Sequence, residues 1–373
     1  MRNLIECPGE RSDVLIIDEA GSEFITKCIP VQLSISVLKI RKGIPYINKP
    51  VFLLHLCKRV FQFRLTQRAL ITSIVDVIKP KVIISFIDTS IIMGQLDLTF
   101  PQKLVISIQN GARTHMDGFN NNSFLLPHYF AFGEYEKELI KKMNVKCKTF
   151  HGVGSLKLGI FLNNVVKSDN VNNSICFISE YADPLKDKFH IERIRRLKQI
   201  FSNLVTWNDV NYCNIKVALR VNGVTSSNEI EFFNNIGDVE LIKKSDFSSY
   251  NAGYNSSIVI SNISTIGYEL FGAGKKVLFC GMTASNDIFL EEKGINYMMR
   301  KLPDIVLLSS LSQSEFNSKM RSLINMSNEE YLSLTKEARK YYMKCEKKYT
   351  HEVVSEFIAD FMQKETLTIG SNV

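Results

Sequence analysis

The stretch SIVISNISTIGYELFGAGKKVLFC, residues 257–280, carries the pattern that decides the fold. Its apolar run at 258–260 is typical of a buried strand, and a segment of helical composition and a second apolar run at 277–279 follow it. Ser264 and Thr265 form a small polar turn between the first strand and the helix. A strand, a turn, a helix and a second strand in this order predict a parallel sheet with helices on its faces.

Short apolar runs alternate with helix-like stretches through the rest of the chain. Strands are expected at 13–18, 81–88, 103–111, 128–133, 175–181, 215–221, 239–243, 257–262 and 276–281. Helices are expected at 63–80, 134–144 and 190–204, and near the C-terminus at about 327–364. The Asn-rich segment 162–174 is typical of a linker. The sequence therefore predicts an α/β fold of two Rossmann-like domains facing a cleft, at 1–165 and 166–373, the second with a C-terminal helical tail.

Length and composition place the chain among ordinary globular proteins. It has 373 residues, of which 45% are hydrophobic and 23% are charged. No apolar run reaches the roughly 18–20 residues of a membrane span, and the N-terminal residues lack the apolar core of a signal peptide. Its eight cysteines are scattered without CxxC spacing, which predicts neither a zinc site nor a disulfide framework. We therefore expect a cytoplasmic protein.

The net charge of +8 narrows the classes of partner. A basic surface attracts nucleic acid, anionic lipid or anionic sugars, although it is also common in proteins that bind none of these. No RNA-binding signature or zinc finger occurs, so nucleic acid is not expected. A lipid-linked, anionic substrate would suit this charge, with peripheral association at the inner face of the membrane.

Polar residues at the ends of the expected strands form the candidate site, because ligands in open α/β sheets bind at the carboxyl ends of strands. These ends carry Asp88, Asn110, Arg113 and His115 in the first half, and Glu180, Arg220 and residues 264–267 in the second. Arg113 could bind a carboxylate or phosphate, and His115 or Glu180 could act as an acid or base. The competing interpretations are that His115 has a purely structural role and that Glu180 is an ordinary carboxylate of a surface loop.

The turn at Ser264, Thr265 and Gly267 predicts an anion site, because a helix start presents N–H groups and small residues allow close approach. Glu269, one helical turn further on, could accept hydrogen bonds from a ribose. The alternative is an ordinary Ser/Thr N-cap with a glycine that lets the helix pack. Neither GxxxxGK[ST] nor GxGxxG occurs, so the sequence gives little support for a Walker A loop or a dinucleotide site.

Several of these segments together resemble a known group of enzymes. The segments are QNG at 109–111, FAFGEYEKELI at 130–140, GVGSLKLG at 152–159 and STIGYELFGAGKKVLF at 264–279. Their order, across roughly residues 80–285, resembles bacterial GT-B-type glycosyltransferases that build surface polysaccharides, and above all the retaining β-Kdo transferases. Glycerophosphotransferases and sugar epimerases show similar blocks.

The resemblance implies a nucleotide-sugar donor on the C-terminal domain and a glycan acceptor on the N-terminal domain. In the donor site, Ser264, Thr265 and Gly267 would meet the phosphate, Glu269 the ribose, and Arg220 a phosphate or the donor carboxylate. The acid or base would be Glu180, and the acceptor would lie near Asp88, Asn110 and Arg113. No cofactor and no metal are implied, since basic groups and helix N-termini stabilise the leaving phosphate.

One position departs from the β-Kdo transferase pattern. An aspartate nucleophile is expected directly before the Ser-Thr pair, where this chain has Ile263. An inverting reaction would need only one base, such as Glu180, Asp88 or His115. The function expected is transfer of a sugar, for example Kdo from a CMP donor, to a capsule or lipopolysaccharide O-antigen acceptor. The alternatives are a polyol-phosphate transferase, a sugar-nucleotide epimerase, and a non-catalytic relative of such enzymes.

Overall fold

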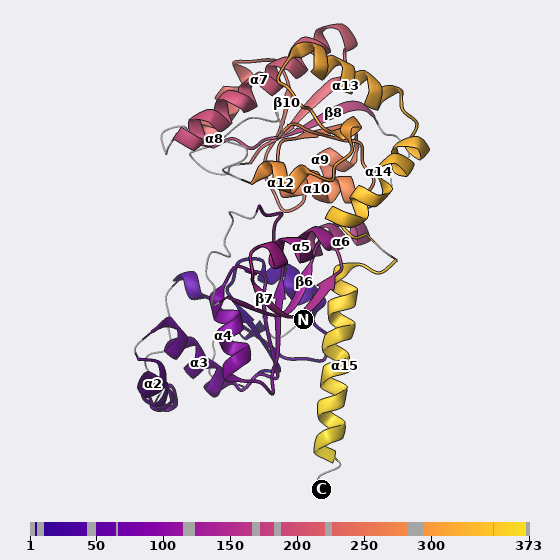
Figure 1. The fold of residues 1–373 in the computed structure, drawn as a ribbon. Coiled ribbons are helices and arrows are strands. Elements are labelled where there is room, and N and C mark those ends of the chain that lie inside the picture. Colours follow the sequence, from indigo (N-terminus) through magenta and orange to yellow (C-terminus); the bar gives the residue numbers. More distant parts are fainter. Residues whose placement is uncertain are drawn as a thin grey trace. The chain divides into compact units, whose positions relative to one another are not determined.

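The computed structural model describes residues 4–5, 11–42, 50–64, 66–114, 124–165, 172–182, 188–220, 226–281, 294–345 and 347–370. The chain divides into two compact units. The N-terminal unit holds residues 1–111, 118–163 and 345–373, and the C-terminal unit holds 112–117 and 164–344. Each unit is a parallel sheet with helices on its faces, so the prediction of two Rossmann-like α/β domains is confirmed (Figure 1).

The sheet of the N-terminal unit is parallel throughout, in the order β1-β3-β2-β4-β5-β6-β7. Its strands are β1 (Leu4–Ile5), β2 (Val14–Ile17), β3 (Ile35–Leu38), β4 (Val82–Ser85), β5 (Leu104–Ile108), β6 (Leu125–Ala131) and β7 (Lys146–Gly152). Every residue of β2, β4 and β5 is buried. Burial on both faces explains why these strands are nearly continuous apolar runs in the sequence.

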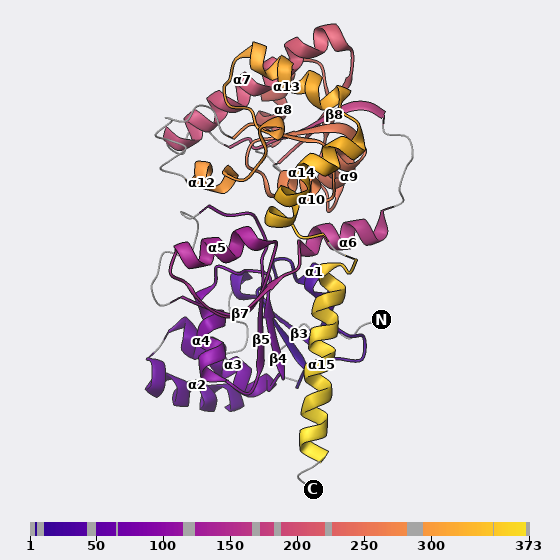
Figure 2. The same cartoon turned by 45° about the vertical axis from the view of Figure 1, so that its right-hand side comes forward.

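Helices cover both faces of this sheet. They are α1 (Ser22–Ile25), α2 (Pro50–Phe63), α3 (Gln67–Ile78), α4 (Ile91–Thr99), α5 (Glu134–Lys142), α6 (Leu156–Asn164) and α15 (Thr350–Gly370), with the short turns η1 (Thr26–Cys28) and η2 (Ile40–Lys42). Helix α4 packs on β5 and β6, and α2 packs on α3. Figure 2 shows α3 and α4 on one side of the strands and α15 on the other.

The C-terminal helix α15 belongs to the N-terminal unit, which differs from the expected assignment of all residues from 166 to 373 to the second domain. The Thr350 hydroxyl donates a hydrogen bond to the carbonyl of Val153 at 2.9 Å. Phe357 packs against the rings of His128 and His151, with centroids 5.1 Å apart in both pairs. The helical tail is therefore two helices that pack in different units, with α15 covering the edge strand β7 and its neighbour β6.

The C-terminal unit has a five-stranded parallel sheet in the order β10-β9-β8-β11-β12. Its strands are β8 (Asn172–Ile178), β9 (Asn214–Ala218), β10 (Glu240–Ile242), β11 (Ser256–Ser261) and β12 (Val277–Phe279). Its helices are α7 (Lys188–Asn211), α8 (Ser226–Asn234), α9 (Ser248–Tyr254), α10 (Thr265–Gly272), α12 (Ile295–Met299), α13 (Gln313–Asn325) and α14 (Asn328–Tyr342), with the turn η3 (Asp304–Val306).

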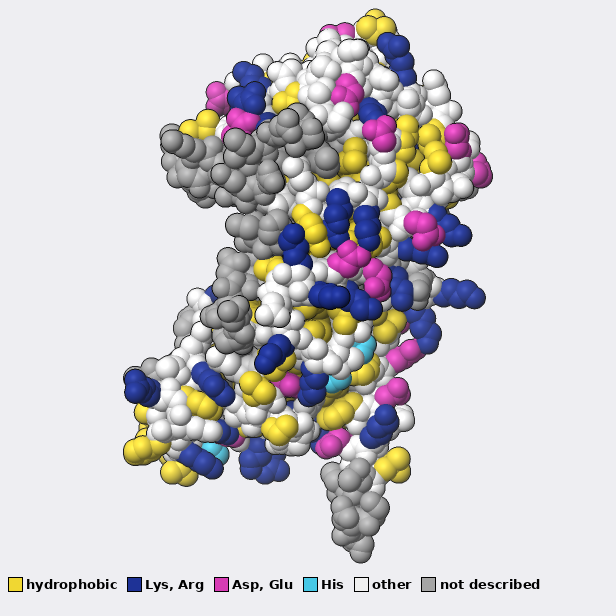
Figure 3. Space-filling view, viewed as in Figure 1, with side chains coloured by type: hydrophobic (Ala, Val, Ile, Leu, Met, Phe, Trp, Pro, Cys, Tyr) yellow, Lys and Arg dark blue, Asp and Glu magenta, His cyan; other side chains and the backbone are white. Residues whose placement is uncertain are grey.

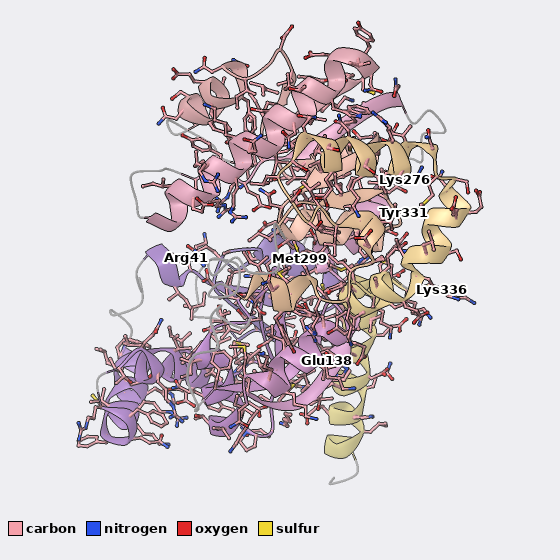
Figure 4. All side chains as sticks on the ribbon, turned by 45° about the horizontal axis from the view of Figure 1, so that its top comes forward. Arg41, Glu138, Lys276, Met299, Tyr331 and Lys336 are labelled. Carbon is pink, nitrogen blue, oxygen red and sulfur yellow. The ribbon has the colours of Figure 1, made fainter. Side chains whose placement is uncertain are left out.

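Aromatic residues fill the core on the α7 and α8 side of this sheet. Phe177, Phe201 and Phe233 are at most 1% exposed and form edge-to-face pairs. On the other side, Tyr331 of α14 (Figure 4) holds the start of β12. Its hydroxyl accepts from Val277 N at 3.1 Å and donates to the carbonyl of Lys275 at 2.9 Å. These contacts hold the edge strand β12 beside β11, and the candidate turn follows the end of β11.

Candidate functional site

Glu180 lies at the carboxyl end of β8 and joins two neighbouring strand ends of the C-terminal unit. Its side chain is buried, with 3% exposed. One carboxylate oxygen accepts a hydrogen bond from the backbone N–H of Ile263, after β11, at 2.7 Å. The other lies 3.2 Å from Nη2 of Arg193 on α7. Because β8 and β11 are adjacent and parallel, their ends meet at one edge, and the carboxylate is held there by two donors.

Arg220 follows β9 at the same edge. Its guanidinium Nη1 donates to the carbonyl of Tyr181 at 2.9 Å, and its backbone N–H donates to Glu229 at 2.9 Å. Glu229 is fully buried and also accepts from the hydroxyl of Ser179. The pKa of Arg220 is lowered from its ordinary value, mainly by burial and then by the nearby Arg193. The carboxylates of Glu180 and Glu229 oppose this shift. Two arginines therefore lie within electrostatic range of one another around Glu180.

The Ser-Thr turn opens α10 as the sequence predicted. Ser264 is the N-cap residue, but its side chain makes no capping hydrogen bond to the helix. The Thr265 hydroxyl accepts from the backbone N–H of Ala112 at 3.0 Å, and Ala112 belongs to the same compact unit. A Cβ on Gly267 would lie 2.7 Å from the Cβ of Ser261, so this glycine lets α10 pack on β11. The packing interpretation of Gly267 is thus supported, whereas capping by the Ser264 side chain is not.

Glu269 points into the interior of the C-terminal unit. Its side chain is 2% exposed, and one carboxylate oxygen accepts from the Tyr250 hydroxyl on α9 at 2.6 Å. Burial and the neighbouring carboxylate raise the pKa of Tyr250 well above its ordinary value, so this hydroxyl stays a donor. The carboxylate expected near a ribose is therefore held in place by a second helix.

In the N-terminal unit, the ends of β2 and β4 carry two carboxylates with partners. Asp88 is fully buried after β4 and accepts from the Tyr129 hydroxyl at 3.0 Å. Asp18 follows β2 with a φ of 76° and pairs with Nε of Arg41, which is 3.0 Å from each of its carboxylate oxygens. Of the two, Asp88 was singled out as a catalytic candidate, and it is the more deeply buried.

A buried polar network holds the QNG turn after β5, next to Asn110. Gln109 donates to Glu136 and to the carbonyl of Gly111, each at 2.9 Å, and accepts from the backbone N–H of Phe132 at 2.8 Å. Glu136 also accepts from the N–H of Gly133 at 3.0 Å. Burial raises the pKa of Glu136 to about 8, although these two donors oppose the shift. The network ties the ends of β5 and β6 together.

The remaining N-terminal candidates are separated by the division into units. Arg113 is half-buried and lies in the segment 112–117, which groups with the C-terminal unit. His115 lies outside the described residues. Asn110 stays with the N-terminal unit. The structure therefore gathers Glu180, Arg220 and the α10 turn at one sheet edge, whereas the three described first-half candidates fall in two units, Asp88 and Asn110 in one and Arg113 in the other.

Sequence reasoning missed three residues of these sites. Arg193 lies within α7 rather than at a strand end, and only its spacing from Glu180 in the folded unit reveals it. Gln109 and Glu136 sit inside the segments QNG and FGEYE, where Glu136 occupies the third helical position after the N-cap Gly133. That capping-box position is the signal that could have identified Glu136.

No group of three or more His, Cys, Asp or Glu side chains suited to a metal occurs among the residues that the structure describes. The sequence expectation of a metal-free site stays a prediction. In the same described part of the chain, no helix is both long enough and apolar enough to cross a membrane.

Solved structures of similar fold cover nearly the whole chain. UDP-GlcNAc 2-epimerase from Neisseria meningitidis, solved bound to UDP-GlcNAc, has a TM-score of 0.54 and 16% identity, over 94% of this chain and 99% of that one. The Methanocaldococcus jannaschii UDP-GlcNAc 2-epimerase, in complex with UDP-GlcNAc and UDP, has a TM-score of 0.54 and 10% identity, with the same coverage. The wall teichoic acid polymerase TagF has a TM-score of 0.54 and 11% identity, over 97% of this chain and 91% of that one.

These comparisons define the fold and leave the activity open. At such identities the likeness shows a GT-B-type fold of two Rossmann-like domains, as the sequence predicted. No protein-family model matches the chain, and no curated protein matches it in sequence. The specific resemblance to β-Kdo transferases stays a prediction.

Proposed function

We propose that the chain is a glycosyltransferase that moves a sugar from a nucleotide donor to a cell-surface glycan. The observation that carries this proposal is the grouping of Arg193 and Arg220 around Glu180 at the carboxyl edge of the C-terminal sheet. The two guanidiniums stand beside two carboxylates, Glu180 and Glu229, and they supply the N–H donors that suit a nucleotide phosphate. Two proteins of similar fold were solved with UDP-GlcNAc, which supports a nucleotide sugar as substrate.

In the proposed donor site, the start of α10 binds the phosphate. Ser264 and Thr265 contribute small side chains and the first N–H groups of an eight-residue helix, and Gly267, whose own N–H donates to the carbonyl of Ser264 at 2.9 Å, leaves room for the phosphate. Glu269 binds the ribose, and the hydrogen bond from Tyr250 fixes the orientation of its carboxylate. The proposal needs no metal or cofactor, because the arginines and the helix start balance the charge of the leaving phosphate.

The donor sugar is proposed to be acidic, as in a CMP-linked Kdo or a related sugar. Such a donor carries a carboxylate besides its phosphate, and two arginines offer a partner for each. Ile263 cannot act as a nucleophile, so we propose an inverting transfer with a single base. Its candidates are Asp88, Glu180 and His115. Glu180 would first have to leave Arg193, which holds one of its oxygens.

The acceptor is proposed to be a lipid-linked or polysaccharide glycan bound by the N-terminal unit. Asn110 remains the proposed contact there, since the Gln109–Glu136 network orders the turn that carries it, whereas Arg113 groups with the C-terminal unit. Two other reactions are supported by the fold comparisons alone. The similar epimerases favour a sugar-nucleotide epimerase, and TagF favours a polyol-phosphate transferase. Ile263 instead favours a non-catalytic relative.

The donor site is tested by nucleotide-dependent thermal stability of the purified chain. A ligand that binds only the folded state stabilises it by about 2.7 kcal/mol at a hundredfold excess over Kd. We expect CMP to raise the midpoint, and Arg193→Gln or Arg220→Gln to abolish the shift. Arg195→Gln is the matched control, because Arg195 lies on α7 but is 61% exposed and pairs with Glu192. A folded chain that responds to none of CMP, CDP, UDP, GDP and dTDP would favour the non-catalytic relative.

The reaction is then assigned from the products. A transferase releases free nucleotide only when an acceptor is present, whereas an epimerase converts its nucleotide sugar without any acceptor. Stabilisation by UDP, GDP or dTDP alone would contradict the CMP donor, and stabilisation by CDP alone would favour polyol-phosphate transfer.

A further inference from the structure

Helix α2 is the outermost layer on its side of the N-terminal unit, and its outward face is apolar. It packs on α3, which in turn lies against the sheet (Figure 1). The exposed fractions are 94% for Phe61, 71% for Leu54 and 58% for Val51. Spacings of three and seven residues place these side chains in one stripe of a helix that turns about 100° per residue. With Lys58, which lies in the same stripe, they form what we call the α2 outer face.

The opposite face of α2 packs in the hydrophobic core. Phe52 is 2% exposed in the main hydrophobic cluster of the N-terminal unit, and Leu56 packs against that cluster. The helix is therefore apolar on two sides, only one of which folding buries. On soluble proteins, large exposed apolar patches rimmed by polar residues mark sites that bind proteins, membranes or ligands.

The sequence in and around α2 is basic. The sequence has no Asp or Glu from residue 24 to 75, and nine basic residues fall in that range: Lys27, Lys39, Arg41, Lys42, Lys49, Lys58, Arg59, Arg64 and Arg68. The first acidic residue after this range is Asp76, and its carboxylate forms an ion pair with Nε of Arg59 at 2.7 Å. Lys58 and Arg64 are exposed and form no ion pair with any described residue. Figure 3 shows Lys and Arg beside hydrophobic side chains at the end of this unit where Figure 1 places α2.

We propose that the α2 outer face docks the protein on the surface of an anionic lipid bilayer. An apolar stripe flanked by Lys and Arg is the pattern of helices that lie in the membrane interface. Fourteen residues span about 21 Å, less than the about 30 Å of a hydrocarbon core, so the helix lies in the plane of the membrane. A second copy of the chain fits poorly, because a twofold interface would bring Lys58 and its basic neighbours against their own copies.

The test is co-sedimentation of the full chain with lipid vesicles. Vesicles of equal phosphatidylglycerol and phosphatidylcholine should bind the protein, vesicles of phosphatidylcholine alone should bind it less, and high salt should weaken binding to the anionic vesicles. The double variant Leu54→Glu, Phe61→Glu should bind anionic vesicles at least about tenfold more weakly, because it removes two apolar anchors and adds two negative charges.

The matched control is Val210→Glu, Leu334→Glu, which adds the same charge at exposed apolar positions of the C-terminal unit, 77% and 56% exposed. It should bind vesicles nearly as the unaltered chain does, and an equal loss would overturn the proposal. So would a chain that ignores anionic vesicles, or a dimer in light scattering that only the α2 double variant dissociates. Unchanged thermal midpoints establish that both variants fold. Vesicle binding is measured without a nucleotide, so the result does not depend on whether the proposed donor site is correct.

Discussion

Replacing Gly267 by alanine should destabilise the protein when residue 261 is serine, and should stabilise it when Ser261 has been replaced by glycine. Alanine in a helix is favoured over glycine by about 1 kcal/mol, so the substitution alone would stabilise α10. The new Cβ, however, would lie 2.7 Å from the Cβ of Ser261 on β11, well inside ordinary contact distance. Ser261 is 1% exposed, and its hydroxyl has no hydrogen-bond partner among the described residues. Removing its side chain therefore frees space without breaking a hydrogen bond.

The magnitudes follow from these two terms. Overpacking a rigid core costs about 1–3 kcal/mol, so Gly267→Ala should lower the free energy of unfolding by up to about 2 kcal/mol. Ser261→Gly alone should cost about 0.5–1 kcal/mol as a glycine within a strand. In the Ser261→Gly background the overpacking disappears, and Gly267→Ala should stabilise by about 1 kcal/mol. The coupling between the two substitutions is thus about 1–3 kcal/mol.

The assay is urea unfolding followed by tryptophan fluorescence. The chain has a single tryptophan, Trp207, which is 4% exposed on α7, so the signal reports the C-terminal unit. The four proteins of the cycle should share one m-value, because they expose similar surface on unfolding. If Gly267→Ala changes stability equally in both backgrounds, to within about 0.5 kcal/mol, the packing argument is refuted.

Three other substitutions test the buried polar and aromatic contacts. Because the pKa of Glu136 is raised from 4.5 to about 8, the folded chain keeps a proton that the unfolded chain releases, so stability should fall as pH rises between those values. Glu136→Gln should flatten that slope in thermal midpoints, and an unchanged slope would contradict it. Tyr250→Phe leaves the Glu269 carboxylate without this donor and should cost about 1–3 kcal/mol in the fluorescence transition; no loss would refute the role. Phe357→Ala should cost about 2 kcal/mol or more and speed proteolytic removal of α15, which an unchanged cleavage rate would disprove.

The sequence predicted the sheets well because parallel strands buried on both faces leave a strong signal. The run at 257–262 became β11 at Ser256–Ser261, and the run at 81–88 became β4 at Val82–Ser85. Strand β3 was not expected, because Ser34 and Ser36 interrupt the apolar run in its part of the sequence. The partner of α15 was also beyond prediction, because an amphipathic pattern shows that a helix packs but not on which surface.

The site was less predictable than the fold, because strand ends identify residues but not their partners. Glu180 was found by its position, yet its pairing with Arg193 depends on where α7 crosses the sheet. Glu269 was recognised by its spacing from the turn, whereas its bond to Tyr250 comes from a separate helix. Tertiary contacts of this kind link residues far apart in the sequence, and periodicity carries no record of them.

The return of α15 to the N-terminal unit makes the C-terminal unit an insertion within it, with consequences for biosynthesis. A ribosome makes the strands of the N-terminal unit first, but it makes the helix that covers β6 and β7 only after the C-terminal unit. The C-terminal unit, at 164–344, can complete its sheet while the earlier unit still exposes His128, Phe130 and His151. Vectorial synthesis should thus leave the N-terminal unit dependent on chaperones until α15 has emerged from the ribosome. A fragment cut after residue 165 would keep that exposed surface permanently.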